Sequence, residues 1–362
     1  MDFTFTPEQD EAAALAAKIL GAEVTIARQR EVEARGDRFD SDLWHTLAEA
    51  GLLGLHLPGQ YDGAGLGLIE LARVLVEVGR VVAPVPLAGH GAAGGVLARC
   101  GTPEQQRAWL PGAASGELVL AVAVSEDHAA VPDSPETHAV PDGDRWLVTG
   151  VKTQVRAGTH ADGFLLTAST PDGVGVFLLS PDAGVEVQKQ RVIDGDVTTR
   201  LVLDGTHAER VGDATAVTLL HQLTIALACA EQLGVVEGAL AETSDYAKTR
   251  EQFDRPIGSF QAVSQRLADG YIDTLCLRLT LWQAIWRLSE GLPAAVEVAT
   301  AKLWAADAGH RLAHTAVHVH GGVGIDLDGI THRYFTAAKR FEFGYGGATE
   351  QALIIGRNLA DR

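Results

Sequence analysis

The spacing of apolar residues changes twice along the chain and so divides it into three parts. Up to about Gly116, apolar residues recur every three or four positions, as at Leu71, Leu75 and Val78. This spacing is typical of amphipathic helices. Residues suited to cap such helices are Asp40 or Ser41, and Thr102 directly before Pro103. The pattern predicts an N-terminal helical domain over residues 1–117.

The second part has the pattern of short β-strands. Runs such as RWLVTGVKTQV and GFLLTAS are separated by PDG, DAG and DGD, which are turn sequences. No helical pattern lies between these runs, which argues against an alternating α/β sheet. The sequence predicts a small antiparallel β domain over residues 118–213.

Helical spacing returns in the third part, over residues 214–362, and the segments are long. One predicted helix runs from Val296 to about His320. Another carries an apolar stripe that includes Ile272, Leu275, Leu279, Trp282 and Trp286. Long amphipathic helices need partners, which favours a C-terminal four-helix bundle. The predicted fold is therefore an α+β multidomain protein with helical, β and helical-bundle parts.

Charge and composition exclude some functions. The 362 residues include 29 Lys+Arg and 47 Asp+Glu, a formal charge of 29 − 47 = −18, which argues against nucleic-acid and anionic-membrane partners. Stretches 81–98 and 214–230 carry few charges but are short or broken, so we expect them in the core. The N-terminus lacks the pattern of a signal peptide, and three widely spaced cysteines form no framework, so we expect a cytoplasmic protein.

Two further patterns have ordinary structural explanations. His310, His314 and His318 share one helix face, but no carboxylate helper or HExxH accompanies them, so we predict a polar seam or partner contact and no metal. The glycine runs at 63–67 and 321–324 do not follow a strand in a βαβ unit, so no nicotinamide site is predicted. The second run ends a long helix, where paired glycines let a ligand or another backbone approach closely.

The most informative segment is YAKTREQFDRPIGSFQAVSQRL, residues 246–267. Arg250 is a cation able to hold a phosphate through two hydrogen bonds, and Phe253 and Phe260 offer apolar faces. Gln261 can both donate and accept. These residue types suit a nucleotide, yet they suit an ordinary helical hairpin with a surface arginine equally well.

This segment resembles the RxxFGxPIxxFQ signature of the acyl-CoA dehydrogenase family, and Asp254 alone departs from it, where glycine is usual. The resemblance extends to LWHTLAEAGLLGLHLPGQYDGAGLG, WLVTGVKTQVRAGTHADGFLLTA and VHVHGGVGIDLDGITHRYF, in the family's order. It implies three domains, FAD, an acyl-CoA substrate oxidised to the α,β-enoyl form, tetramers, and an electron-transfer flavoprotein as acceptor.

The resemblance also implies a set of cofactor-binding residues. Arg250, Phe253 and Gln261 would contact the pyrophosphate and adenine half of an FAD held mainly by a neighbouring subunit. His318 stands where the family often has glutamine, and Gly321 with Gly322 would let the backbone approach that cofactor.

The catalytic glutamate of the family has no counterpart here. In the segment FEFGYGGATEQ, Gly346 stands at the glutamate's usual position, and Glu342 and Glu350 are displaced by several residues. The other position that the family uses falls near Thr224, which is no carboxylate. Removal of the α-proton requires a well-placed base, so we predict no catalytic residue in this chain.

The side that would face the flavin ring is altered too. Gln154 replaces a tryptophan and Arg156 a threonine, and of the usual TEPGAGSD pattern Ser125 and Glu126 persist. This resembles the base-lacking subunit of α2β2 steroid-type acyl-CoA dehydrogenases from bacteria, which would need a second acyl-CoA dehydrogenase-like subunit as partner.

Other functions remain open from the sequence. They are a self-sufficient dehydrogenase, as a homo-oligomer, with Glu342 or Glu350 as base; a flavin-free scaffold that binds thioesters; and a related flavin oxidase or monooxygenase.

Overall fold

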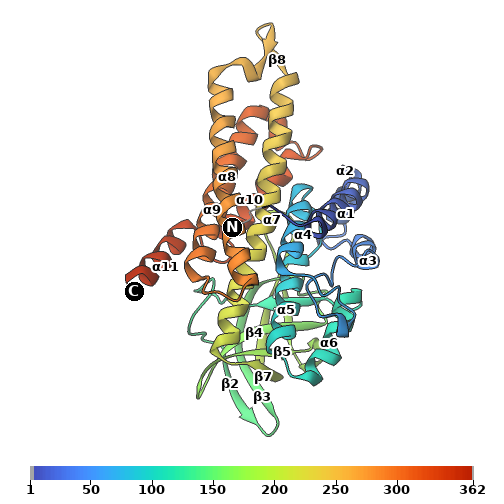
Figure 1. The fold of residues 1–362 in the computed structure, drawn as a ribbon, viewed down its shortest axis with the longest axis vertical. Helices are drawn as coiled ribbons and strands as arrows, with labels where there is room; N and C mark the ends of the chain where they lie inside the picture. The colour runs from blue at the N-terminus through green and yellow to red at the C-terminus, as the bar shows by residue number, and fades with distance from the viewer. Residues whose placement is uncertain (1–3, 361–362) are drawn as a thin grey trace. The chain divides into compact units, whose positions relative to one another are not determined.

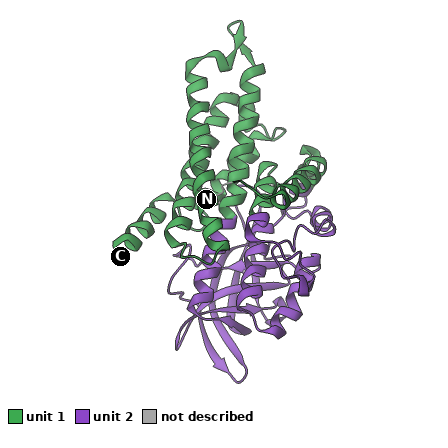
Figure 2. Cartoon of the chain, in the orientation of Figure 1, with its two compact units in different colours: residues 1–31, 72–83, 228–362 green, residues 32–71, 84–227 purple. Residues whose placement is uncertain are grey.

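The computed structural model describes residues 4–360, which form two compact units (Figure 2). Unit 1 comprises Met1–Glu31, Ala72–Ala83 and Ala228–Arg362, and unit 2 comprises Val32–Leu71 and Pro84–Leu227. Helices α2, α4 and α7 run from one unit into the other, so the compact units do not follow the three predicted domains. The boundaries 1–117, 118–213 and 214–362 stay a prediction.

Unit 1 is mostly helical. Its elements, with those that cross the boundary given in full, are α1 (Pro7–Glu23), α2 (Ile26–Ala34), α4 (Leu68–Arg80), α7 (Ala214–Thr249), β8 (Glu251–Gln252), β9 (Arg255–Pro256), η3 (Ile257–Ser259), α8 (Gln261–Ser289), α9 (Ala295–His320), η4 (Gly321–Ile325), α10 (Thr331–Phe343) and α11 (Ala348–Ala360). The helix predicted from Val296 to His320 is confirmed as α9.

Helices α7, α8 and α9 belong to the C-terminal bundle (Figure 1), and side-chain hydrogen bonds of α7 join it to the other two. Glu237 of α7 accepts from Arg278 of α8 at 2.7 Å. Gln232 donates to the backbone carbonyl of Ala305 in α9 at 3.1 Å. Helix α7 thus packs against both neighbours, as a four-helix arrangement requires.

Helix α8 leaves much of its predicted apolar stripe uncovered within the described residues 4–360. Its inward face carries instead Gly270, Asp273, Thr274, Leu277, Leu281, Ala284, Ile285 and Leu288. On the outward face, Ile272 is 55% exposed and Leu279 is 63% exposed. Exposed apolar rows of this length are characteristic of surfaces that another protein covers.

Unit 2 contains a seven-stranded sheet that closes on itself, because β5 pairs with both β7 and β4. Its strands are β1 (Leu120–Ala123), β2 (His138–Asp142), β3 (Arg145–Arg156), β4 (Gly163–Thr170), β5 (Gly173–Leu179), β6 (Glu186–Arg191) and β7 (Val197–Gly212), with η2 (Pro181–Ala183) before β6. The prediction of an antiparallel β domain was wrong in part, since β1 and β2 each pair with β4 in parallel. The prediction used the turn sequences, which indicate where strands end but do not determine which strands pair or in which direction.

The helices of unit 2 are α3 (Ser41–Glu49), α5 (Leu87–Cys100) and α6 (Pro103–Ser115), together with η1 (Gly59–Tyr61) and the start of α7. Two predicted caps are confirmed. The Asp40 side chain accepts from the backbone amide of Leu43, and Thr102 forms a capping box with Gln105.

Helix α7 is long and apolar enough to cross a membrane by length and composition, but 89% of its most apolar window is buried inside the protein. A core helix passes the same test, and the burial agrees with the expectation that 214–230 lies in the core.

Candidate functional site

The predicted signature segment forms a hairpin between α7 and α8, at the end of unit 1 where β8 is labelled (Figure 1). Phe253 and Asp254 connect β8 to β9, and both have positive φ, 54° and 61°. A two-residue turn with two left-handed residues favours glycine at its second position. This explains why the signature has glycine there, and aspartate tolerates the same backbone.

The hairpin presents a cation and aromatic rings to solvent. Phe253 is 86% exposed and lies edge-on to Phe260, with ring centroids 6.1 Å apart. The guanidinium of Arg255 lies 4.1 Å above the Phe260 ring. The exposed Arg250 side chain makes no ion pair or hydrogen bond with any described residue. Unpaired charge beside exposed rings is the chemistry that an anionic nucleotide requires.

The end of α9 offers open backbone. His318 is exposed in the last turn of α9, and Gly321 and Gly322 follow it. A Cβ added at either glycine would meet no described atom within 4 Å. These two glycines therefore leave room for another molecule to approach the backbone.

A ring contact joins the end of α9 to the foot of the hairpin. Tyr246, in the last turn of α7, stacks on His320 with centroids 4.2 Å apart. All six predicted cofactor residues lie in unit 1, in the hairpin, at the start of α8 or at the end of α9. We call them the nucleotide surface: Arg250, Phe253, Gln261, His318, Gly321 and Gly322.

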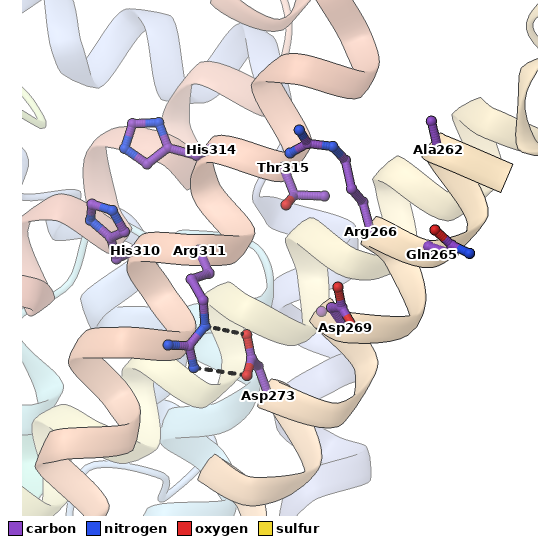
Figure 3. A pocket seen from close by; sticks show the side chains of 10 residues that line it. Ala262, Gln265, Arg266, Asp269, Asp273, His310, Arg311, His314 and Thr315 are labelled. Carbon is purple, nitrogen blue, oxygen red and sulfur yellow. Dashed lines mark hydrogen bonds and ion pairs between the residues drawn. The ribbon is translucent and has the colours of Figure 1, made fainter. Parts of the chain in front are cut away.

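A cavity of about 570 Å³ lies between α8 and α9, one helical turn from Gln261 and His318 (Figure 3). Its wall is polar. Arg311 is paired with Asp273 through two hydrogen bonds of 2.7 and 2.8 Å, whereas Arg266 makes no such contact with the described residues. Asp269 also lines the cavity, so its two arginines and two aspartates balance in formal charge.

Two of the three predicted seam histidines, His310 and His314, contact α10, whereas His318 is exposed. His310 contacts Glu342 at 3.0 Å, and His314 lies edge-on to Phe335. Burial, with the nearby Lys339 and His310, lowers the pKa of His314. Among residues 4–360, no three His, Cys, Asp or Glu side chains are grouped to hold a metal ion.

The backbone at Gly346 opposes a carboxylate at that position. Its φ is +90°, and an added Cβ would lie 2.9 Å from the side chains of Gln351 and Glu350. The buried Lys302 donates to the carbonyl of Phe341 at 2.9 Å and so fixes the end of the preceding helix. The turn is therefore built for glycine.

The nearby carboxylates already have partners. Glu342 accepts from Lys339 at 2.8 Å, and Glu231 accepts from Arg340 at 3.2 Å. Glu350 accepts from the amide of Gly347 at 3.2 Å. In unit 2, the hydroxyl of Thr224, at the alternative base position, is buried and has no hydrogen-bond partner in the described part of the chain.

The flavin-side positions in unit 2 are occupied by charged and strained residues. The Nε of Arg156 donates to Asp196 at 3.1 Å, and Asp196 is 4% exposed. Gln154 has a positive φ of 54°, and its amide donates to Gln190. An ion pair stands where the family has a small hydroxyl side chain.

Sequence reasoning missed the role of Glu126. Its carboxylate accepts from the buried Nζ of Lys152 at 2.8 Å and from the amides of Glu136 and Thr137. Burial lowers the pKa of Lys152 to about 8, although Glu126 opposes this shift. The Glu126–Lys152 pair stabilises the loop from 127 to 136. Glu126 and Lys152 are too far apart in sequence for a local pattern to predict their contact.

Comparison with known proteins gives a consistent result. Two family models match: "Acyl-CoA dehydrogenase, N-terminal domain" over residues 6–117 and "Acyl-CoA dehydrogenase, C-terminal domain" over residues 215–360. Acyl-CoA dehydrogenase FadE27 of Mycobacterium tuberculosis is 46% identical over 100% of this chain and 99% of its own length.

Solved structures agree with this. A chain of the ChsE4-ChsE5 complex from Mycobacterium tuberculosis is 46% identical, with a TM-score of 0.96 and full coverage of both chains. A chain of the Tcur3481-Tcur3483 steroid ACAD, a G363A variant, is 40% identical, with a TM-score of 0.93 and 98% coverage of both chains. More distant structures with this fold hold FAD or FADH2.

Proposed function

Since the chain belongs to the acyl-CoA dehydrogenase family, we propose that it is the base-lacking subunit of an α2β2 complex and completes the FAD site of its partner. One contrast carries the proposal. The nucleotide surface is exposed and its arginine is unpaired, whereas the base positions hold Gly346 and Thr224, and Arg156 on the flavin side is ion-paired. In the half of the site that would contact the FAD of a neighbouring subunit, Arg250, Phe253 and Gln261 keep the residue types of the family's signature.

The nucleotide surface fits the adenine and pyrophosphate half of FAD. Arg250 would hold the pyrophosphate through its guanidinium, and Phe253 would offer an apolar face to the adenine. Gln261 supplies an amide edge, and Gly321 and Gly322 give the cofactor access to the backbone. When bound, FAD supplies the hydride acceptor for oxidation of the substrate.

Proton removal is assigned to the partner subunit. Oxidation of an acyl-CoA thioester needs a carboxylate that takes the α-proton, and each candidate in unit 1 is engaged elsewhere. Glu342, the first alternative base, is held by Lys339 and His310. These contacts favour a partner-dependent subunit over a self-sufficient enzyme.

A partner subunit would also cover exposed apolar surface. In unit 1, Ile272 and Leu279 on α8, Leu327, and Leu353 on α11 are each more than half exposed. Burial of such side chains gives the main driving force for association. The ChsE4-ChsE5 and Tcur3481-Tcur3483 structures are complexes of two named chains, which supports a heteromer here.

The substrate is proposed to be a steroid-type acyl-CoA thioester, because the Tcur3481-Tcur3483 relative is described as a steroid ACAD. An electron-transfer flavoprotein in the cytoplasm is the proposed acceptor.

Co-expression tests the proposal. The chain should be produced alone. It should also be produced together with each acyl-CoA dehydrogenase-like protein that a neighbouring gene encodes and that bears the family's glutamate. Little FAD in the lone chain, and one FAD per pair of subunits in the complex, is the expected result. Stoichiometric FAD in the lone chain, reduced on addition of an acyl-CoA, would instead show a self-sufficient enzyme.

Arg250→Ala separates the proposal from the flavin-free scaffold. Loss of FAD from an otherwise assembled complex is expected, because the pyrophosphate loses its charge-assisted hydrogen bonds. Arg99→Ala is the control, since Arg99 is an exposed arginine of α5 in unit 2 that makes no hydrogen bond or ion pair with the described residues. Unchanged FAD content in Arg250→Ala would favour the scaffold.

A further inference from the structure

The two halves of the nucleotide surface come from different parts of unit 1. Arg250 and Phe253 belong to the hairpin after α7, and His318, Gly321 and Gly322 belong to the end of α9. For both to hold one nucleotide, the hairpin and the α9 terminus must keep a fixed relation. A misplacement of about 1 Å is enough to weaken a positioned contact strongly.

Tyr246 and His320 make the contact that fixes this relation. Their rings are nearly parallel, with an interplanar angle of 22° and centroids 4.2 Å apart. His320 is 7% exposed, and its Nδ1 contacts the carbonyl of Ala316 at 2.9 Å, which sets the orientation of the imidazole ring. The Nε2 atom of His320 is buried and has no hydrogen-bond partner among residues 4–360, so this one bond and the stacking hold the ring.

Each ring is rigidly joined to its half of the surface. On the hairpin side, Gly258 packs so closely on the last turn of α7 that an added Cβ would lie 3.0 Å from the carbonyl oxygen of Ala247, the neighbour of Tyr246. The amide of Ile257 also donates to the carbonyl of Arg250 at 2.8 Å. The hairpin therefore moves with Tyr246.

The same construction recurs at the end of α9. An added Cβ at Gly324 would lie 3.0 Å from the Cβ of His320 and 3.0 Å from the Cα of Val317. The turn that contains Gly321 and Gly322 is thus folded tightly against the residue that stacks on Tyr246. The turn therefore moves with His320.

We propose that the Tyr246–His320 stack positions the two halves of the nucleotide surface for one FAD molecule. The inference rests on the proposed function, because it assigns positioning residues to that surface. Neither residue needs to touch the cofactor. The stack keeps Arg250 and Gly321 at a fixed distance and orientation, so that FAD binding requires no rearrangement of the hairpin.

The test is the rate at which FAD leaves the assembled complex, followed by the rise in flavin fluorescence after dilution. Tyr246→Leu keeps an apolar side chain but removes the ring. We expect faster FAD release by roughly 3- to 10-fold, the equivalent of one lost aromatic contact. Tyr246→Phe keeps the stacked ring and should retain the original rate, and His320→Phe, which loses the contact with Ala316 but keeps a ring, should release FAD more slowly than His320→Leu.

Phe39→Leu is the matched control. Phe39 also contacts a histidine ring, His160, at 4.7 Å, but in unit 2. A loss of thermal stability in this variant with an unchanged FAD release rate is expected. Equal acceleration by Phe39→Leu and Tyr246→Leu, or no acceleration by Tyr246→Leu, would overturn the inference.

Arg250→Ala, measured in parallel, separates the two proposals. If Arg250→Ala releases FAD and Tyr246→Leu does not, the positioning role fails while the proposed function stands. If Arg250→Ala leaves FAD in place, the proposed function is contradicted, and with it the positioning role that rests on that function. Should Tyr246→Leu not assemble, His320→Leu compared with His320→Phe gives the same test from the other ring.

Discussion

Arg156, the last residue of β3, donates its Nε hydrogen at 3.1 Å to Asp196, which directly precedes β7 in unit 2. The two side chains are 17% and 6% exposed, so the pair is largely withdrawn from water. The threonine that the family usually carries at position 156 has no charge. An ion pair that is largely withdrawn from water therefore occupies the place where the family carries a small, uncharged hydroxyl group.

Arg156→Thr should therefore weaken the fold rather than restore a flavin site. The substitution removes the Arg156 guanidinium from the buried Asp196 carboxylate, and the loss of one member of a buried ion pair costs about 3 kcal/mol in the free energy of unfolding. Urea unfolding measures this loss. The double variant Arg156→Thr with Asp196→Asn should recover part of it, since no unpaired charge remains. A single variant as stable as the original chain would contradict this account.

Gly346→Glu should fail to create a catalytic base, although it restores the family's residue. At a φ of +90° a side chain strains the backbone by about 1–2 kcal/mol, and its Cβ would crowd Gln351 and Glu350. We expect a less stable protein, by thermal unfolding, and no flavin reduction by acyl-CoA in the lone chain. Turnover by the lone variant would show that the loop adapts to the glutamate.

Gly356→Glu controls for the added charge and size. Gly356 lies inside α11, and no atom lies within 4 Å of an added Cβ. Glutamate is a better helix former than glycine, so this variant should gain about 0.5–1 kcal/mol. If both Gly346→Glu and Gly356→Glu destabilise the protein, the effect at position 346 does not come from the backbone conformation of Gly346.

Glu342→Gln tests the alternative in which this chain supplies its own base. Because Glu342 is engaged by Lys339 and His310, we expect turnover of the complex to stay close to that of the original protein. Loss of a true general base lowers the rate by about 10²- to 10⁴-fold. Steady-state kinetics with an acyl-CoA distinguishes the two results, and Glu350→Gln repeats the test at the second candidate.

Local chemistry explains which features could be predicted from the sequence. The family, the order of helical, β and helical parts, and the helix from Val296 to His320 were predicted correctly, because they depend on spacing and on neighbouring residues. Asp40 and Thr102 cap helices through residues three positions away, and the signature from Arg250 to Gln261 folds within a single hairpin.

The missed features depend on partners that are distant in sequence. Nothing in the sequence near Arg156 indicates Asp196, and nothing near Tyr246 indicates His320. The apolar stripe of α8 was predicted by its periodicity, but periodicity does not tell whether the same chain covers it. Ile272 and Leu279 are exposed because the inward face of α8 uses another set of residues.

Acid should destabilise unit 2 through three buried histidines. Burial lowers the pKa of His56, His90 and His221 to about 4. His90 uses both ring nitrogens, since Nε2 contacts the carbonyl of Ala113 and Nδ1 accepts from the amide of Leu120. A second ring proton would break the latter bond, so this imidazole must stay neutral in the folded protein.

The sign of the effect follows from the lowered pKa values. Between pH 6.5 and pH 4 these histidines take up protons in the unfolded chain but not in the folded one, so stability falls as the pH falls. Each histidine contributes a slope of about 1.4 kcal/mol per pH unit, and together they give about 4 kcal/mol per pH unit.

Urea unfolding at a series of pH values measures the slope. His56→Gln should reduce it by about one third, whereas His138→Gln, at an exposed position in β2, should leave it unchanged. A flat profile over this range would mean that the three imidazoles accept protons in the folded protein.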